Sequence, residues 1–133
     1  MVKLVPKTEK KIEPNGKKNN LRIPPQSLES EQAVLGSIML RKDAMHEVED
    51  MVTPESFYSE KHRKIFQAML DLANKNEPID MLSLSTKLGE QKLLESVGGN
   101  AYLAEIVNVV PSSTNVKHYA DIVQKKYVLR SLI

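Results

Sequence analysis

The sequence predicts an all-α fold: a compact orthogonal bundle of roughly six or seven short helices, with a longer C-terminal helix and a disordered tail in front. Two observations support this prediction. From Ile23 onward the apolar residues recur at helical spacing, and almost no stretch alternates with the two-residue period of a strand. With 133 residues and no cysteine, the chain has the length of one domain and can build its core without disulfides.

The positive charge of the chain is concentrated at its start. Residues 1–20 hold six lysines and two glutamates, whereas residues 21–133 hold 13 basic and 15 acidic side chains. The first segment has few apolar side chains, so their burial cannot offset the conformational entropy that is lost when a chain becomes ordered. Residues 1–21 are therefore predicted to be a disordered basic tail. Residues 22–133 form the predicted helical domain. A small helical DNA-binding module that uses the basic tail stays open as an alternative function, because lysines contact phosphates without sequence preference.

The first three predicted helices each follow a residue that can cap a helix N-terminus. Ser27 precedes the first, Asp43 a short second, and Ser59 a third that reaches about Lys75. Gly36, inside the first helix, costs up to about 1 kcal/mol relative to alanine, which favours a close approach of another backbone there. The apolar positions expected to face the core are Leu28, Val34, Leu35, Ile38, Met39, Met45, Val48, Val52, Ile65, Phe66, Met69, Leu72 and Ala73.

The second half of the domain continues the same pattern. Asp80 is expected to cap a fourth helix that ends at Gly89, and Asn100 a fifth. One or two extra turns lie between them, and Ser113 or Thr114 begins the last and longest helix. The apolar positions assigned to these elements are Met81, Leu84, Leu88, Leu93, Leu94, Val97, Leu103, Ile106, Val107 and Val110.

The last helix is apolar on two sides and therefore needs two packing partners. One stripe holds Val116, Tyr119, Ala120, Val123 and Tyr127, and the other holds Ile122, Leu129, Leu132 and Ile133. The sequence reaches its final residue in mid-pattern, without the Gly, Asn or Pro that usually stops a helix. We therefore expect a partner or further chain to cover Leu129, Leu132 and Ile133, which are the candidate oligomer or partner surface.

No constellation of residues predicts a catalytic, cofactor or metal site. The five glycines fit neither GxxxxGK(S/T) nor GxGxxG, and His46 lacks the second histidine of HExxH. His62 is expected on or beside the buried face of the third helix, as a packed or hydrogen-bonded core residue. An acidic cluster of Glu47, Glu49 and Asp50 is expected to fan over the solvent side of the second helix, which implies no buried partner. No apolar run approaches the roughly 18 residues of a membrane helix, so a cytoplasmic protein without membrane contact is expected.

One ordered set of motifs is more specific. It begins with RIPPQSLESEQAVLGSIML at residues 22–40. It continues through Glu55–Tyr58, His62–Phe66, Pro78–Asp80, Leu94, Val97–Gly99, Tyr102–Leu103, Pro111–Ser112, Asn115, Tyr119–Ala120 and Ile122–Val123. Together these segments resemble the N-terminal domain of the bacterial replicative DNA helicase, the DnaB family.

The resemblance implies a non-catalytic domain of a ring-shaped hexamer that unwinds DNA 5′ to 3′ with ATP. ATP and Mg²⁺ would bind in a RecA-like domain that follows through a linker, and DNA would be contacted only by the full-length helicase in the nucleoid-associated replisome. The implied partners are the protein itself, as a dimer and a hexameric collar, a DnaG-type primase, and a helicase loader. In the family the last helix pairs with a following helix in a hairpin that builds the dimer, so the chain is expected to end inside that hairpin.

Overall fold

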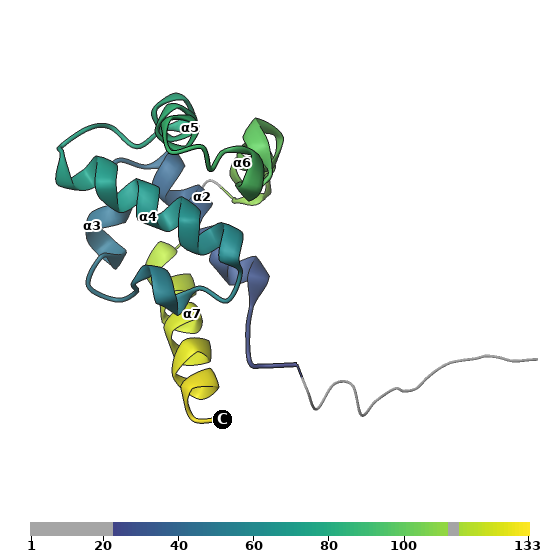
Figure 1. Cartoon of the computed structure of the whole chain (residues 1–133). Coiled ribbons are helices and arrows are strands. Elements are labelled where there is room, and N and C mark those ends of the chain that lie inside the picture. Colours follow the sequence, from purple (N-terminus) through teal and green to yellow (C-terminus); the bar gives the residue numbers. More distant parts are fainter. Residues whose placement is uncertain (1–22, 112–114) are drawn as a thin grey trace, which may run out of the picture.

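The computed structural model describes residues 23–111 and 115–133, which contain helices and no strand (Figure 1). The α-helices are α2 (Leu28–Leu40), α3 (Ala44–Val48), α4 (Glu60–Asn74), α5 (Met81–Glu90), α6 (Gly99–Val109) and α7 (Val116–Ser131). Two 3₁₀ turns, η1 (Pro54–Ser56) and η2 (Glu95–Val97), join them. The predicted all-α fold with a long last helix is confirmed. The predicted tail, residues 1–21, lies outside the described residues.

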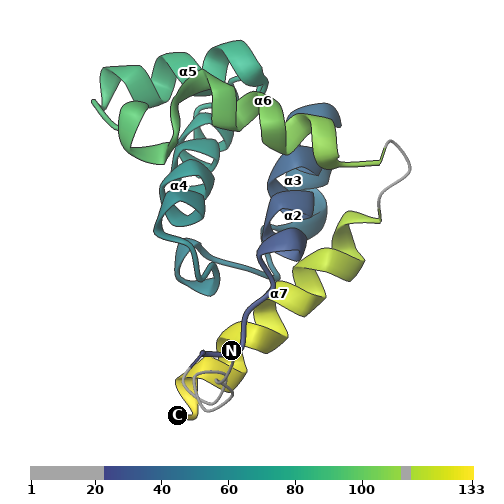
Figure 2. The same cartoon turned by 90° about the vertical axis from the view of Figure 1, so that its right-hand side faces the viewer.

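Helix α2 is the centre of the domain and contacts α3, α4, α6 and α7. Figure 2 shows α4 standing beside α2, with α5 and α6 lying across one end of both. Helix α7 runs obliquely along α2, and its C-terminal end projects beyond the other helices (Figures 1 and 2). Every α-helix contributes side chains to one core, among them Leu35, Val48, Phe66, Leu88, Ile106 and Val116. No helix in the described part of the chain combines the length and apolarity of a membrane span.

Gly36 allows α2 and α6 to pack closely. A Cβ atom at this position would lie 2.9 Å from the carbonyl oxygen of Ile106 and would overlap Cγ2 of Val110. The expected approach of another backbone at this glycine is therefore confirmed. Space, rather than backbone conformation, excludes a larger residue here.

Three of the predicted N-caps form as expected. The side chains of Ser27, Ser59 and Asp80 each accept a hydrogen bond from the backbone N–H three residues further along the chain. At Asp80 the donor is Ser83, at 2.8 Å, and this bond is the main reason why the pKa of the Asp80 carboxyl lies below its ordinary value. The N–H of Asp80 in turn donates to the Ser83 hydroxyl at 3.0 Å, which completes a capping box.

Other helix ends differ from the prediction. Asp43 precedes α3, but its side chain makes no capping hydrogen bond. Helix α5 continues one residue past Gly89. Helix α6 begins at Gly99 rather than after Asn100, because Gly98 adopts a left-handed conformation (φ 104°) that turns the chain into the helix without a side-chain cap.

The start of α7 also differs from the prediction. Ser113 and Thr114, where the last helix was predicted to begin, lie outside the described residues. The side chain of Asn115 caps α7 by accepting from the N–H of His118 at 3.4 Å. An asparagine serves this purpose as well as serine or threonine does, so residue type alone did not exclude Asn115, which the prediction passed over.

Candidate functional site

Helix α7 passes from the core to the surface along its length. Its N-terminal half buries Val116, Ala120 and Val123. The four apolar residues near its C-terminal end are exposed, and they include all three predicted partner-surface residues: Val128 at 46%, Leu129 at 48%, Leu132 at 77% and Ile133 at 89%. We call residues 128–133 the α7 tip.

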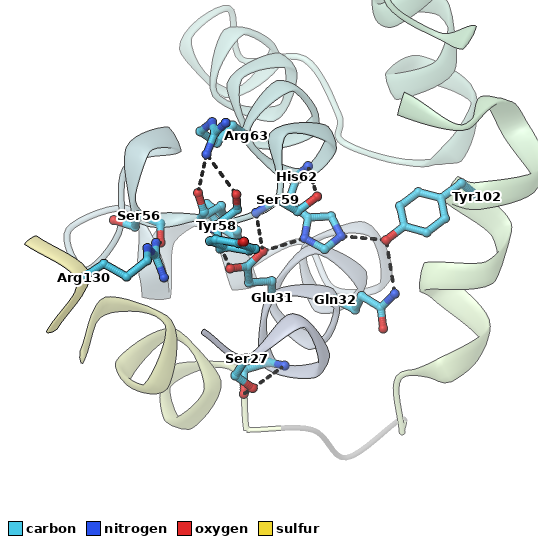
Figure 3. A network of polar contacts seen from close by, with 12 residues as sticks. Ser27, Glu31, Gln32, Ser56, Tyr58, Ser59, His62, Arg63, Tyr102 and Arg130 are labelled. Atoms are coloured by element: carbon cyan, nitrogen blue, oxygen red, sulfur yellow. Dashed lines mark hydrogen bonds and ion pairs between the residues drawn. The ribbon is translucent and has the colours of Figure 1, made fainter. Parts of the chain in front are cut away.

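Beyond Val123, hydrogen bonds rather than apolar burial hold α7 to the rest of the domain. The Ser56 hydroxyl donates to Oε1 of Gln124 at 2.8 Å. The Arg130 guanidinium donates from Nη2 to the carbonyl of Ser56 at 2.9 Å and from Nη1 to the carbonyl of Pro25 at 2.8 Å. Figure 3 shows Arg130 beside Ser56 at the edge of the domain. Three segments therefore meet here: the chain before α2, the η1 turn and α7.

An open groove of about 670 Å³ lies beside these contacts. Tyr58 and Tyr127 line it together with Leu28 and Arg130. The guanidinium carbon of Arg130 lies 5.4 Å from the ring centroid of Tyr58 and 5.8 Å from that of Tyr127, distances at which a cation is attracted to an aromatic ring. Glu55, Glu60 and Arg63 also line it, so the groove combines aromatic surface with side chains of both charges.

A buried carboxylate fixes the loop that supplies Tyr58 to the groove. Glu31 and His62 are each only 1% exposed. Oε2 of Glu31 accepts from the backbone N–H of Tyr58 at 2.7 Å, and Oε1 lies 3.3 Å from the N–H of Ser59 (Figure 3). The same Oε1 is 2.7 Å from Nδ1 of His62. One side chain from α2 therefore joins the loop before α4 to α4 itself.

The network continues from His62 to α6. Nε2 of His62 lies 2.7 Å from the hydroxyl of Tyr102, and the amide of Gln32 donates to that hydroxyl at 3.2 Å. Both ring nitrogens of the buried His62 therefore have a hydrogen-bond partner, a carboxylate at Nδ1 and a hydroxyl at Nε2. Burial raises the pKa of the Tyr102 hydroxyl above its ordinary value. The prediction that His62 is a hydrogen-bonded core residue is confirmed.

Residues 23–125 of the chain match the family described as the DnaB-like helicase N terminal domain. The chain belongs to this family. It is 45% identical over 114 residues to the replicative DNA helicase DnaC of Bacillus subtilis (strain 168), an alignment that covers 86% of this chain and 25% of that protein. It is 46% identical over 112 residues to the replicative DNA helicase DnaB of Geobacillus stearothermophilus, covering 84% and 25%. This DnaB-type domain thus spans about a quarter of the length of these relatives.

Solved structures share its fold. The N-terminal domain of DnaB helicase from Mycobacterium tuberculosis superimposes with a TM-score of 0.80 at 39% identity, over 83% of this chain and 80% of that one. A DnaB-like replicative helicase, studied with its interactions with primase, gives a TM-score of 0.71 at 34% identity, over 79% of this chain and 25% of the other. The match is thus to a whole N-terminal domain and to one part of a longer helicase chain.

Sequence reasoning missed part of the polar framework of this DnaB-type domain. From its position, Glu31 is simply an acidic residue favourable in the first turn of α2, whereas the structure buries it against His62. A buried imidazole needs a hydrogen-bond partner, so the predicted burial of His62 was the signal that could have found Glu31. No comparable signal marked Arg130, because both of its hydrogen-bond acceptors are backbone carbonyls.

The acidic cluster has no site-forming role in the structure. Glu49 and Asp50 are exposed, and Glu47 is half-buried, 3.3 Å from Arg41. Glu49 pairs with the exposed His46 at 3.1 Å. Among residues 23–111 and 115–133, no group of three or more His, Cys, Asp or Glu side chains is arranged to hold a metal ion.

Proposed function

We propose that this domain is a non-catalytic scaffold of a replicative, ATP-dependent DNA helicase, which mediates assembly of subunits into dimers and a hexameric collar and docks a DnaG-type primase at the replication fork. The observation that carries the proposal is the apolar α7 tip on a member of the DnaB-like N-terminal domain family. Neighbouring apolar side chains exposed on one projecting helix end are typical of a protein–protein interface.

Primase docking is supported by the similarity to a helicase that was studied with its interactions with primase. ATP and Mg²⁺ are proposed to bind in another part of the full-length protein, because this sequence contains no P-loop. Contact with DNA, and with a helicase loader, is likewise assigned to the assembled helicase. The proposals for ATP, Mg²⁺, DNA and the loader are supported by family membership and not by any one contact within the domain.

The assembly role is tested with Leu129→Asp in the full-length protein. A carboxylate on the α7 tip would have to be desolvated in the interface, so we expect the hexamer to be lost in sedimentation velocity experiments. Leu82→Asp is the matched control, since Leu82 is 76% exposed on α5 and belongs to another surface. A Leu129→Asp protein that remains hexameric, or a control that dissociates equally, would contradict assembly through the tip.

The docking role is tested by pull-down with the C-terminal domain of the cognate primase. We expect the full-length helicase to retain primase, and the isolated 133-residue chain to retain less if primase bridges two subunits. Absence of binding to the full-length protein would refute docking, whatever the result with the isolated chain.

A DNA-binding module remains the alternative function, favoured by the excess of lysine in residues 1–20. Fluorescence anisotropy with duplex and single-stranded DNA at low and moderate salt separates the two proposals. Binding that disappears when residues 1–20 are deleted belongs to the tail alone, with the steep salt dependence of phosphate contacts. Binding that persists without the tail would place DNA contacts on the helical body as well and favour a DNA-binding module in which the tail is only one part.

A further inference from the structure

We infer that Ser56 and Arg130 form a clamp that sets the direction in which the α7 tip leaves the domain. The inference concerns this chain's own geometry; only its consequence for subunit assembly rests on the proposed function. It starts from the change in burial along α7: no residue after Val123 in this helix is buried. The eight residues from Gln124 to Ser131 form a segment about 12 Å long whose direction no buried apolar side chain fixes.

Ser56 holds this segment at two points. Its hydroxyl donates to Gln124, and its carbonyl accepts from Arg130. The two α7 residues are six positions apart, or about 9 Å along the helix axis, so both contacts together fix the tilt of the segment and not only its distance from the body. Ser56 itself is 1% exposed, and its hydroxyl also accepts from the N–H of Thr53 at 3.0 Å, so the clamp has a fixed base.

Arg130 adds the third contact, to the chain that precedes α2. Its acceptor there is the carbonyl of Pro25, in a Pro24–Pro25 pair that restricts the backbone of this segment to an extended path. The planar guanidinium reaches two carbonyls at once, and the Tyr58 and Tyr127 rings flank it. A lysine at this position has the charge but not the rigid fork of donors. Arg130 is therefore a positioning residue for the tip.

The clamp matters because small changes in direction become large displacements at the end of the helix. A swing of about 20° moves the end of a segment about 12 Å long by about 4 Å. In an assembly that joins subunits through the tip, such a displacement changes the angle between neighbours while leaving the apolar side chains of the tip intact. The clamp thus governs the geometry of assembly, and the apolar residues govern its affinity.

The test measures the direction of the tip in solution. The chain has no native cysteine, so a pair of spin labels can be placed by Gln67→Cys on α4 and Ser131→Cys on α7, both exposed positions. Double electron–electron resonance then gives the distribution of distances between the labels. Dilution with unlabelled chain removes distances between molecules. We expect a narrow distribution for the parent protein.

Arg130→Met is the main variant, because it keeps an unbranched stem and removes both hydrogen bonds of the guanidinium. We expect its distribution to broaden or shift by about 4 Å, as for a segment about 12 Å long that swings by about 20°. Arg130→Lys should restore the parent distribution only in part. Lys125→Met is the matched control on the same helix; it removes an exposed ion pair with Asp121 at 3.1 Å, and we expect no change.

Gln124→Met keeps the test decisive if Arg130→Met fails to fold, since it removes one contact of a half-exposed residue. Far-UV circular dichroism and the thermal midpoint are recorded for each variant. A parent-like distribution in every folded clamp variant, or equal broadening in Lys125→Met, would overturn the inference. Broadened tip distances in the clamp variants would uphold the clamp even if Leu129→Asp left the full-length protein hexameric, because that second result would contradict only assembly through the tip.

Discussion

Two polar networks in this domain use similar chemistry for different ends. The Glu31–His62–Tyr102 network joins α2, α4 and α6, and its first two members are fully surrounded by the core. The clamp of Ser56 and Arg130 also joins three segments, but at the edge of the domain, where α7 has no buried apolar residue left. Losing hydrogen bonds inside the core lowers the free energy of unfolding strongly, whereas losing those at the edge lowers it less. The hydrogen bonds at the edge mainly set the direction of α7.

The comparison is tested most strongly by Glu31→Ala. This substitution leaves the imidazole of His62 and two backbone N–H groups without their buried acceptor, so we expect the free energy of unfolding to fall by about 3–5 kcal/mol. Urea unfolding followed by circular dichroism measures it. Glu31→Gln keeps one acceptor oxygen and should lose less. A loss in Glu31→Ala no larger than in Arg130→Met would mean that the two networks do not differ as described.

The second-largest loss of stability is expected from a substitution at the contact between α2 and α6. Gly36→Ala introduces a Cβ against the Ile106 carbonyl and Val110, and we expect a loss of about 1–3 kcal/mol, as for other overpacked sites. Gly89→Ala is the matched control in α5, where an added Cβ has no neighbour within 4 Å. That change should stabilise the domain by about 0.5–1 kcal/mol through helix propensity. Equal effects at both glycines would show that the contact between α2 and α6 is loose.

A smaller effect is expected at Asp80, whose capping contacts are exposed to solvent. Asp80→Ala should cost about 1 kcal/mol at neutral pH. The folded-state pKa of Asp80 lies below the value of 3.8 that serves as its reference. Its contribution is therefore fully present above that reference pH and is lost as the pH falls through the folded-state pKa. Asp80→Asn keeps the cap and should remove this component of the acid transition; an unchanged acid transition would contradict the assignment.

The smallest effect on stability is expected from Leu129→Asp in the isolated chain. The side chain lies beyond the last buried residue of α7, so we expect the free energy of unfolding to change by less than about 0.5 kcal/mol. Thermal melting followed by circular dichroism checks this. Loss of helicity in this variant would show that the α7 tip belongs to the core, and the contrast between the two networks would then disappear.

The sequence predicted the fold because the signals for it are local. Apolar periodicity placed the core faces of α2, α4 and α5, and capping residues such as Ser27, Ser59 and Asp80 placed their starts. Leu28 was wrongly assigned to the core: it is 45% exposed, at the first residue of α2. The start of α6 was wrong for a physical reason: Gly98 supplies a left-handed turn, and this backbone property competes with the side-chain cap that Asn100 offered.

The candidate site was predicted only in part. Exposure of Leu129, Leu132 and Ile133 agrees with the second stripe expected on the last helix, while their role in assembly stays a prediction. The contacts that hold this surface could not be predicted, because the partners of Arg130 are carbonyls more than 70 positions away in the sequence. Every residue has a backbone carbonyl, so the residue types in the sequence do not indicate which carbonyls Arg130 binds. Only the folded structure shows these contacts.

The hydrogen bond between Arg130 and the Pro25 carbonyl also has a mechanical meaning. It ties the chain just before the first described helix to the end of the last one, so both ends of the described chain leave from the same pole. Tension applied between residues 23 and 133 therefore loads this bond before it reaches the helical core. The first event under load would be the loss of this bond, before the contact between α7 and α2 opens.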